Sequence, residues 1–122
     1  YVLQAGVDPE NPVAHYSVGS LNWMIVFDKT VERSQEELTN LIEEGQQALD
    51  QALVLDPEYE DAMTYKNLLF REAAALIPED SEEETALAER EGLLAQADTW
   101  FNKPMETRRI IADREAANQV GQ

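Results

Sequence analysis

The sequence predicts an all-α protein built from repeated pairs of helices, and two observations lead to this prediction. Segment 8–14, with the sequence DPENPVA, returns 48 positions later as DPEYEDA at 56–62. Self-similarity at a fixed spacing is the signature of a repeat architecture. Elsewhere, apolar residues recur at steps of three and four, and no stretch alternates apolar and polar residues as a half-buried strand does.

The first helix is expected to run from Pro12 to Phe27. Asn11 can accept a hydrogen bond from the free N–H groups of the first turn, and proline is favoured at the first helical position. The polar segment 28–30 then reads as a connection. The apolar positions of this helix include Val13, Tyr16, Leu21, Met24 and Ile25.

The second helix is expected to begin after Ser34, which has capping-box spacing to Glu37. Its small and apolar residues recur on one helical face, and the Asp56-Pro57 pair ends it. The residues of this face are Leu38, Leu41, Ile42, Gly45, Ala48, Leu49, Ala52 and Leu53.

A third helix is expected from Glu58 to Leu76. Ser81 and Glu84 repeat the capping-box spacing and predict a fourth helix that starts there. Pro104 either begins a short final helix or kinks a longer one, and we expect a break near Asn102-Lys103. The polar tail from residue 116 onward is expected to fray.

Composition and length describe one folded domain. The chain has 122 residues, 43% of them hydrophobic, which is ordinary for a globular protein. It contains no cysteine, which excludes disulfides, thiolate metal sites and a cysteine nucleophile. No apolar run approaches the roughly 20 residues that span a bilayer, so no membrane insertion is expected. The sequence does not assign a cellular compartment, because it is compatible with a cytoplasmic and with an exported protein.

The net charge of −16 is unevenly distributed along the chain. Residues 1–102 carry 22 acidic and five basic side chains, whereas residues 103–122 carry three acidic and four basic ones. Such an acidic body repels phosphate backbones and anionic lipid surfaces. Nucleic acid is therefore not an expected partner.

Four segments resemble the tetratricopeptide repeat (TPR), a family of stacked antiparallel helix pairs. Segment 52–57 (ALVLDP) looks like the end of the second helix of a repeat, and 7–9 (VDP) looks like the same ending of a preceding repeat. Segment 14–19 (AHYSVG) is similar to the opening of a first helix, and 62–67 (AMTYKN) is a looser copy. The resemblance implies a right-handed superhelix of helix pairs with a C-terminal helix.

The resemblance also assigns small residues to the helix crossing. Gly19 and Gly45 fall at the two positions where the family places small residues, and Asn67 replaces the glycine in the second copy. The family period is about 34 residues, so roughly 14 residues have been added between Gly19 and Gly45. The implied organisation is the end of a preceding repeat at 1–11, helix pairs at 12–56 and 57–102, and a C-terminal helix or tail at 103–122.

No motif points to enzyme chemistry, a cofactor or a metal. His15 is the only histidine, and a lone histidine without cysteine or a fixed acidic partner makes a poor site. No phosphate loop, dinucleotide fingerprint, metalloprotease helix or calcium loop is present. We therefore expect a non-enzymatic protein in which His15 has a structural role.

The resemblance implies that the first helices of successive pairs line a concave groove that binds a protein segment. The basic clamp with which some relatives hold acidic tails is missing, so a basic or apolar peptide, or a partner helix, fits better. For Trp23 the alternative is a place in the core of the elongated pair. The expected groove residues are Val13, Tyr16, Ser20, Trp23, Met24, Asp61, Thr64, Leu68, Arg71 and Glu72.

Two other functions stay open. An array of repeats exposes apolar ends, here Val2, Leu3 and Val7, through which the chain could associate with itself as a structural module. A ligand-binding module of the cell envelope is a weaker alternative, since some such proteins are built on these repeats.

The charge leads to a first prediction about stability. Added salt between about 0.01 and 0.5 M should raise the melting temperature, because it screens the mutual repulsion of the carboxylates. Mild acidification toward pH 5–6 should act in the same direction by neutralising part of the charge. Thermal denaturation followed by circular dichroism measures both effects, and a melting temperature that falls steadily with salt would contradict the prediction.

Overall fold

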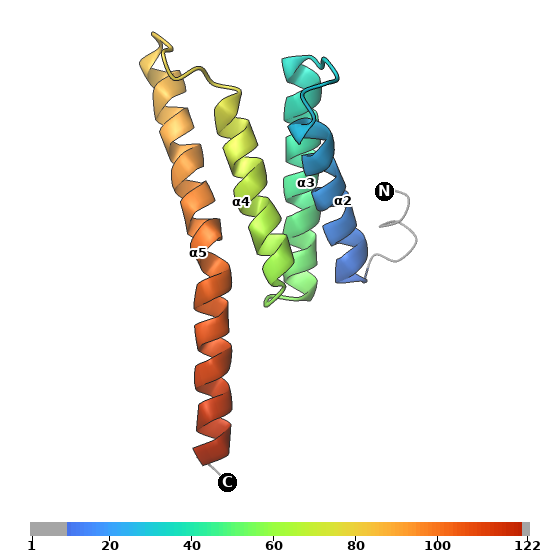
Figure 1. Cartoon of the computed structure of the whole chain (residues 1–122), viewed down its shortest axis with the longest axis vertical. Coiled ribbons are helices and arrows are strands. Elements are labelled where there is room, and N and C mark those ends of the chain that lie inside the picture. The colour runs from blue at the N-terminus through green and yellow to red at the C-terminus, as the bar shows by residue number, and fades with distance from the viewer. Residues whose placement is uncertain (1–9, 121–122) are drawn as a thin grey trace.

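The computed structural model describes residues 10–120 and is helical, with four helices and no strand in that range (Figure 1). These helices are α2 (Pro12–Phe27), α3 (Gln35–Leu55), α4 (Glu60–Ala75) and α5 (Glu84–Val120). The predicted all-α class is confirmed. The expected end of a preceding repeat, with Val2, Leu3 and Val7, lies outside the described residues.

The caps of α2 and α3 are those that the sequence predicts. The side-chain oxygen of Asn11 accepts a hydrogen bond of 2.9 Å from the Val13 amide. The Ser34 hydroxyl accepts one of 3.1 Å from the Glu37 amide. Each bond satisfies an N–H group that the first turn of a helix leaves without an internal partner. Asp56 ends α3, as predicted.

The start and the end of α5 differ from the prediction. The Ser81 hydroxyl accepts a hydrogen bond from the Glu83 amide at 3.3 Å, within a turn, and the helix begins only at Glu84. The predicted break near Asn102-Lys103 is wrong, because α5 runs through Pro104 for 37 residues. It also continues past residue 116, where we expected it to fray. The expected boundary between 102 and 103 therefore falls inside one helix.

Contacts with α4 on both sides of Pro104 explain why the helix continues. An internal proline removes one helical hydrogen bond and costs about 3 kcal/mol. Before it, Ala97 is fully buried; after it, Thr107 is buried with its hydroxyl 3.6 Å from the sulfur of Met63 on α4. Arg108 further donates to the Glu60 carboxylate at 2.6 Å. Tertiary packing thus outweighs the local cost of the proline.

Successive helices run antiparallel and pack in a chain of neighbours (Figure 1). Helix α2 packs on α3 and α4, and α3 packs on α4 as well. Among the described elements, α5 contacts only α4. Consequently α3 and α5 both flank α4, and their backbones do not approach each other closely.

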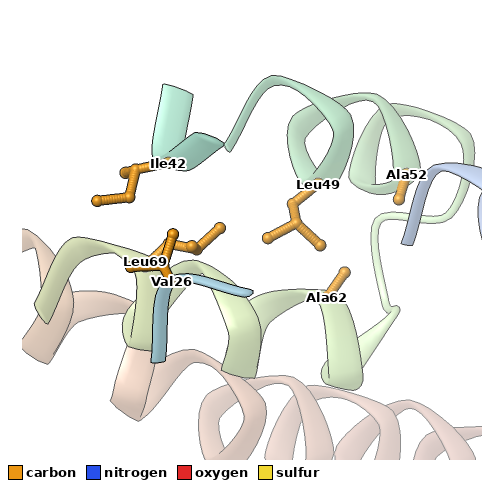
Figure 2. Packing of buried hydrophobic residues seen from close by; sticks show 6 residues of the cluster. All are labelled: Val26, Ile42, Leu49, Ala52, Ala62 and Leu69. Atoms are coloured by element: carbon orange, nitrogen blue, oxygen red, sulfur yellow. The ribbon is translucent and has the colours of Figure 1, made fainter. Parts of the chain in front are cut away.

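The core lies where α2, α3 and α4 meet (Figure 2). Its largest fully buried side chains are Leu49 of α3, Leu69 of α4 and Val26 of α2. Half-buried apolar residues from the same three helices surround them. The buried hydrophobic cluster consists of Val26, Ile42, Leu49, Ala52, Ala62 and Leu69.

The two glycines at the predicted helix crossing lie against each other and against core leucines. A Cβ atom on Gly19 would lie 2.5 Å from Cδ2 of Leu49, and one on Gly45 would lie 2.9 Å from Cδ1 of Leu69. One turn after Gly19, the buried Asn22 amide donates to the Leu41 carbonyl at 3.0 Å. The helices can approach this closely only because both crossing residues lack a side chain.

Replacement of Gly19 by alanine should therefore destabilise the fold. The added methyl group overlaps the fully buried Leu49, and overpacking of this kind costs about 1–3 kcal/mol. Gly92→Ala is a matched control, since a Cβ there meets no atom within 4 Å and the site is an exposed helix position. That control should gain up to about 1 kcal/mol from helix propensity. Urea unfolding measures the free energy of unfolding of both variants. Equal changes in the two variants would contradict the interpretation that Gly19 is required for the close approach of the helices.

Candidate functional site

Two surfaces of the described structure carry the side chains best placed to bind a partner. The first, which we call the first-helix face, is formed by α2 and α4 and contains the residues that the sequence places in a groove. The second, which we call the α3–α5 cleft, lies over α4 between the two helices that flank it.

Aromatic rings join α2 to α4 along the first-helix face. The ring of Tyr16 stacks on Tyr59 with centroids 5.1 Å apart and meets the edge of Tyr65 at 5.6 Å. The ring of Trp23 also meets Tyr65 at 5.6 Å and stacks on Phe27 at 4.7 Å. Such pairs contribute about 0.5–1.5 kcal/mol each beyond the area that they bury. These rings therefore hold the two first helices together and also form part of the surface.

The exposure of the ten predicted groove residues is mixed. Tyr16 and Trp23 are half-buried and pack against the core cluster, so the alternative interpretation of Trp23 as a core residue applies to part of its surface. Four of the ten are exposed, namely Val13, Met24, Asp61 and Thr64. The other half-buried residues are Ser20, Leu68, Arg71 and Glu72.

Two of the predicted groove residues form ion pairs with neighbouring elements. Arg71 donates to the Asp98 carboxylate of α5 at 2.8 Å and to the side chain of Asn67, also at 2.8 Å. Glu72 accepts from the ammonium group of Lys29, in the loop after α2, at 3.0 Å. These charges connect helices and are only partly available to a partner.

Burial raises the pKa of Tyr16 to about 12, from an ordinary value of 10.0. The neighbouring Tyr65 and the carboxylate of Asp61 act in the same direction, because a phenolate would be repelled by other negative charges. The pKa of Tyr59 is also raised, first by burial and then by Asp61. Both tyrosines stay protonated and keep their hydroxyl donors at neutral pH.

The α3–α5 cleft is a hollow with a volume of about 450 Å³. A volume of this size lies in the range of ligand-binding pockets. Its apolar lining comes from α3, α4, α5 and the segment after α4, and comprises Ile42, Phe70, Ala73, Leu76, Ile77 and Leu93. Its polar lining comprises Gln35, Thr39, Glu43, Gln46, Gln47 and Glu89.

None of the ten predicted groove residues lines this cleft. Helical periodicity indicates which residues of α3 and α5 face inward, but the cleft depends on the distance between two helices whose backbones do not approach closely. The sequence signal for its lining is weak for this reason.

A buried lysine next to the cleft connects the three helices that form it. Lys66 on α4 is only 4% exposed, and its ammonium group donates to Asp50 at 2.5 Å and to Gln46 at 3.1 Å, both on α3. The same group lies 5.3 Å from the ring centroid of Phe70 and 5.0 Å from that of Trp100 on α5. A cation over aromatic rings is attracted to their faces.

Lys66 was not among the residues expected at a site, although the sequence carries a signal for its burial. It lies four residues after Ala62 and three before Leu69, on the helical face that those residues bury. Because it bonds with α3 and contacts a ring of α5, Lys66 helps to fix the spacing of the two walls of the cleft.

The lining of the cleft carries acidic but no basic side chains. Glu43 and Glu89 lie on opposite walls and are both exposed, and side-chain amides of α3 make up most of the remaining polar lining. An apolar surface between carboxylates suits an apolar ligand that carries positive charge at its edges.

Residues 10–120 show neither a metal site nor a membrane span. No group of three or more histidine, aspartate or glutamate side chains in that range is arranged to hold a metal ion. None of the helices there is long and apolar enough to cross a membrane.

Comparison of the chain with models of protein families finds no match. Comparison with curated proteins and with solved structures likewise finds none. The two surfaces are therefore the basis for a functional proposal.

The raised pKa of Tyr16 predicts a loss of stability at alkaline pH. Between the ordinary pKa of 10.0 and the folded value of about 12, the folded chain holds this proton more tightly than the unfolded chain. The stabilisation is therefore complete below pH 10 and is lost as the pH rises toward 12. Tyr16→Phe should weaken this pH dependence, and urea midpoints at pH 9, 10 and 11 measure it. If the urea midpoint declines with pH equally in the variant and in the wild type, the raised pKa of Tyr16 is not the cause of the pH dependence.

Proposed function

We propose that the protein is a non-enzymatic, TPR-like interaction scaffold that binds a helical segment of another protein. The observation that carries the proposal is the α3–α5 cleft, an apolar hollow with acidic walls. Helix-in-groove recognition needs such a hollow to accept the apolar face of an amphipathic helix. The bound segment would present basic side chains beside its apolar face.

The TPR-like part of the proposal is supported by the helix pairing. Helices α2 and α3 form one antiparallel pair, α4 and α5 form another, and the two first helices contact each other. Gly19 and Gly45 meet at the crossing of the first pair, as the resemblance implies. In the second pair the buried Asn67 stands at the matching position and accepts a bond from Arg71.

The charge of the chain supports a basic partner. With a net charge of −16, the protein attracts a positively charged segment over a distance of about 8–10 Å at moderate salt. Lys66, the cation next to the cleft, is bonded to Asp50 and Gln46 and leaves no positive charge on the lining. The carboxylates of Glu43 and Glu89 are thus available to the partner.

The first-helix face is the second candidate surface for the same function. Its half-buried aromatic rings, with the exposed Met24 beside them, belong to residue types enriched or adaptable at binding surfaces. None of the predicted groove residues on this face lines the α3–α5 cleft. The two surfaces can be separated by experiment.

A designed amphipathic peptide of about 16 residues provides the test. One version carries lysines beside its leucine face and a second carries glutamates at the same positions. We expect the basic peptide to bind and the acidic one to fail, and the binding to weaken with salt. Fluorescence anisotropy of the labelled peptides measures both.

Two matched leucine variants locate the binding surface. Leu93→Glu places a charge on the wall of the cleft and should lower the affinity at least tenfold, whereas Leu68→Glu alters the first-helix face and should leave it unchanged. Both leucines are half-buried, so circular dichroism must first show equal folding. The opposite pattern would move the site to the first-helix face, and failure of both peptides to bind the wild type would contradict the proposal.

A further inference from the structure

Helix α5 exposes large apolar side chains along its second half. Phe101 is 62% exposed and Met105 is 65% exposed. Residues four apart lie on the same side of a helix, so the two form one apolar surface. No ring contact or hydrogen bond involves either side chain within residues 10–120.

A shallow hollow of about 250 Å³ adjoins this surface. It is lined by Asn102, Met105, Glu106 and Arg109 alone. Their spacing, i, i+3, i+4 and i+7, is that of the four residues that surround one inserted side chain in a coiled coil. Every residue of the hollow comes from α5, so a side chain that fills it has to come from another helix.

The surface is complementary to itself when two copies of α5 run antiparallel. An alignment that sets Phe101 against Met105 of a second copy also sets Met105 against Phe101. In the same register Asp98, which also pairs with Arg71 of its own chain, lies within one residue of Arg109 of the other copy, so that opposite charges meet on both sides of the centre. Arg109 forms no ion pair among the described residues of its own chain.

The charge distribution favours this part of α5 over the acidic body of the chain. Residues 1–102 have 17 more acidic than basic side chains, so two copies repel each other over most of their surface. Between 101 and 112 there are three basic side chains, Lys103, Arg108 and Arg109, and one acidic side chain, Glu106. Two such acidic molecules can approach most closely at this segment.

We propose that two copies of the chain pair through the second half of α5, antiparallel and with twofold symmetry. Phe101 of each copy enters the hollow lined by Asn102, Met105, Glu106 and Arg109 of the other. The hollow shares no residue with the α3–α5 cleft, so the pairing is independent of the proposed helix binding.

Sedimentation equilibrium over about 10–500 μM chain measures the association. We expect the wild type to dimerise. In the double variant Phe101→Glu/Met105→Glu, the dissociation constant of the dimer should rise at least tenfold. Val54→Glu is the control, because Val54 is 71% exposed but lies on α3, outside the α5 surface. A wild-type chain that stays monomeric, or an equal effect of Val54→Glu, would overturn the proposal.

The absence of native cysteine allows the register to be read by cross-linking. A mixture of the Phe101→Cys and Met105→Cys chains should form a mixed disulfide-linked dimer on mild oxidation. Val54→Cys, which is exposed on α3, should form far less. If the wild type dimerises but cysteines introduced at positions 101 and 105 cross-link no better than one at position 54, the copies meet elsewhere and the proposal is again overturned.

Discussion

The close approach of α2 and α3 at Gly19 and Gly45 sets the geometry on which the other contacts depend. Leu49 occupies the space above Gly19, and Leu69 of α4 occupies the space above Gly45. The two leucines are fully buried in the core cluster (Figure 2). A side chain at either glycine would move a leucine, and the leucine from α4 would carry its helix with it. The position of α4 is therefore determined by the absence of two side chains on its neighbours.

The placement of α4 in turn determines both candidate binding surfaces. On one side of α4, the ring of Tyr65 contacts the rings of Tyr16 and Trp23 on α2, and these contacts join the two helices of the first-helix face. Another side presents Lys66 to α3 and to Trp100 of α5. A buried cation needs partners that offset its lost hydration. These partners come from two helices whose backbones do not approach closely, so the lysine links the two walls of the cleft.

Local sequence signals predicted the start of α2 and α3, because capping depends on a few adjacent residues, whereas the resemblance assigned Gly19 and Gly45 to the helix crossing. They failed at Pro104, where contacts of Thr107 and Arg108 with α4 outweigh a local cost that the sequence shows more clearly. The groove residues predicted by resemblance belong to α2 and α4, and two of them, Arg71 and Glu72, form ion pairs with other elements. The α3–α5 cleft could not be predicted, because periodicity gives the faces of helices and not the distances between them.

The packing of α5 against a single helix, α4, has a consequence for how the molecule opens. In a linear array of helices each element is coupled only to its nearest neighbours, and cooperativity between distant elements is weak. Helix α5 can therefore separate as a unit while the interlocked α2, α3 and α4 keep their contacts. Its departure exposes the side of α4 that it covers, including Met63 and the buried amide of Asn67. The amide hydrogens of the chain should thus fall into two classes of exchange protection, with the border between them at the loop before α5.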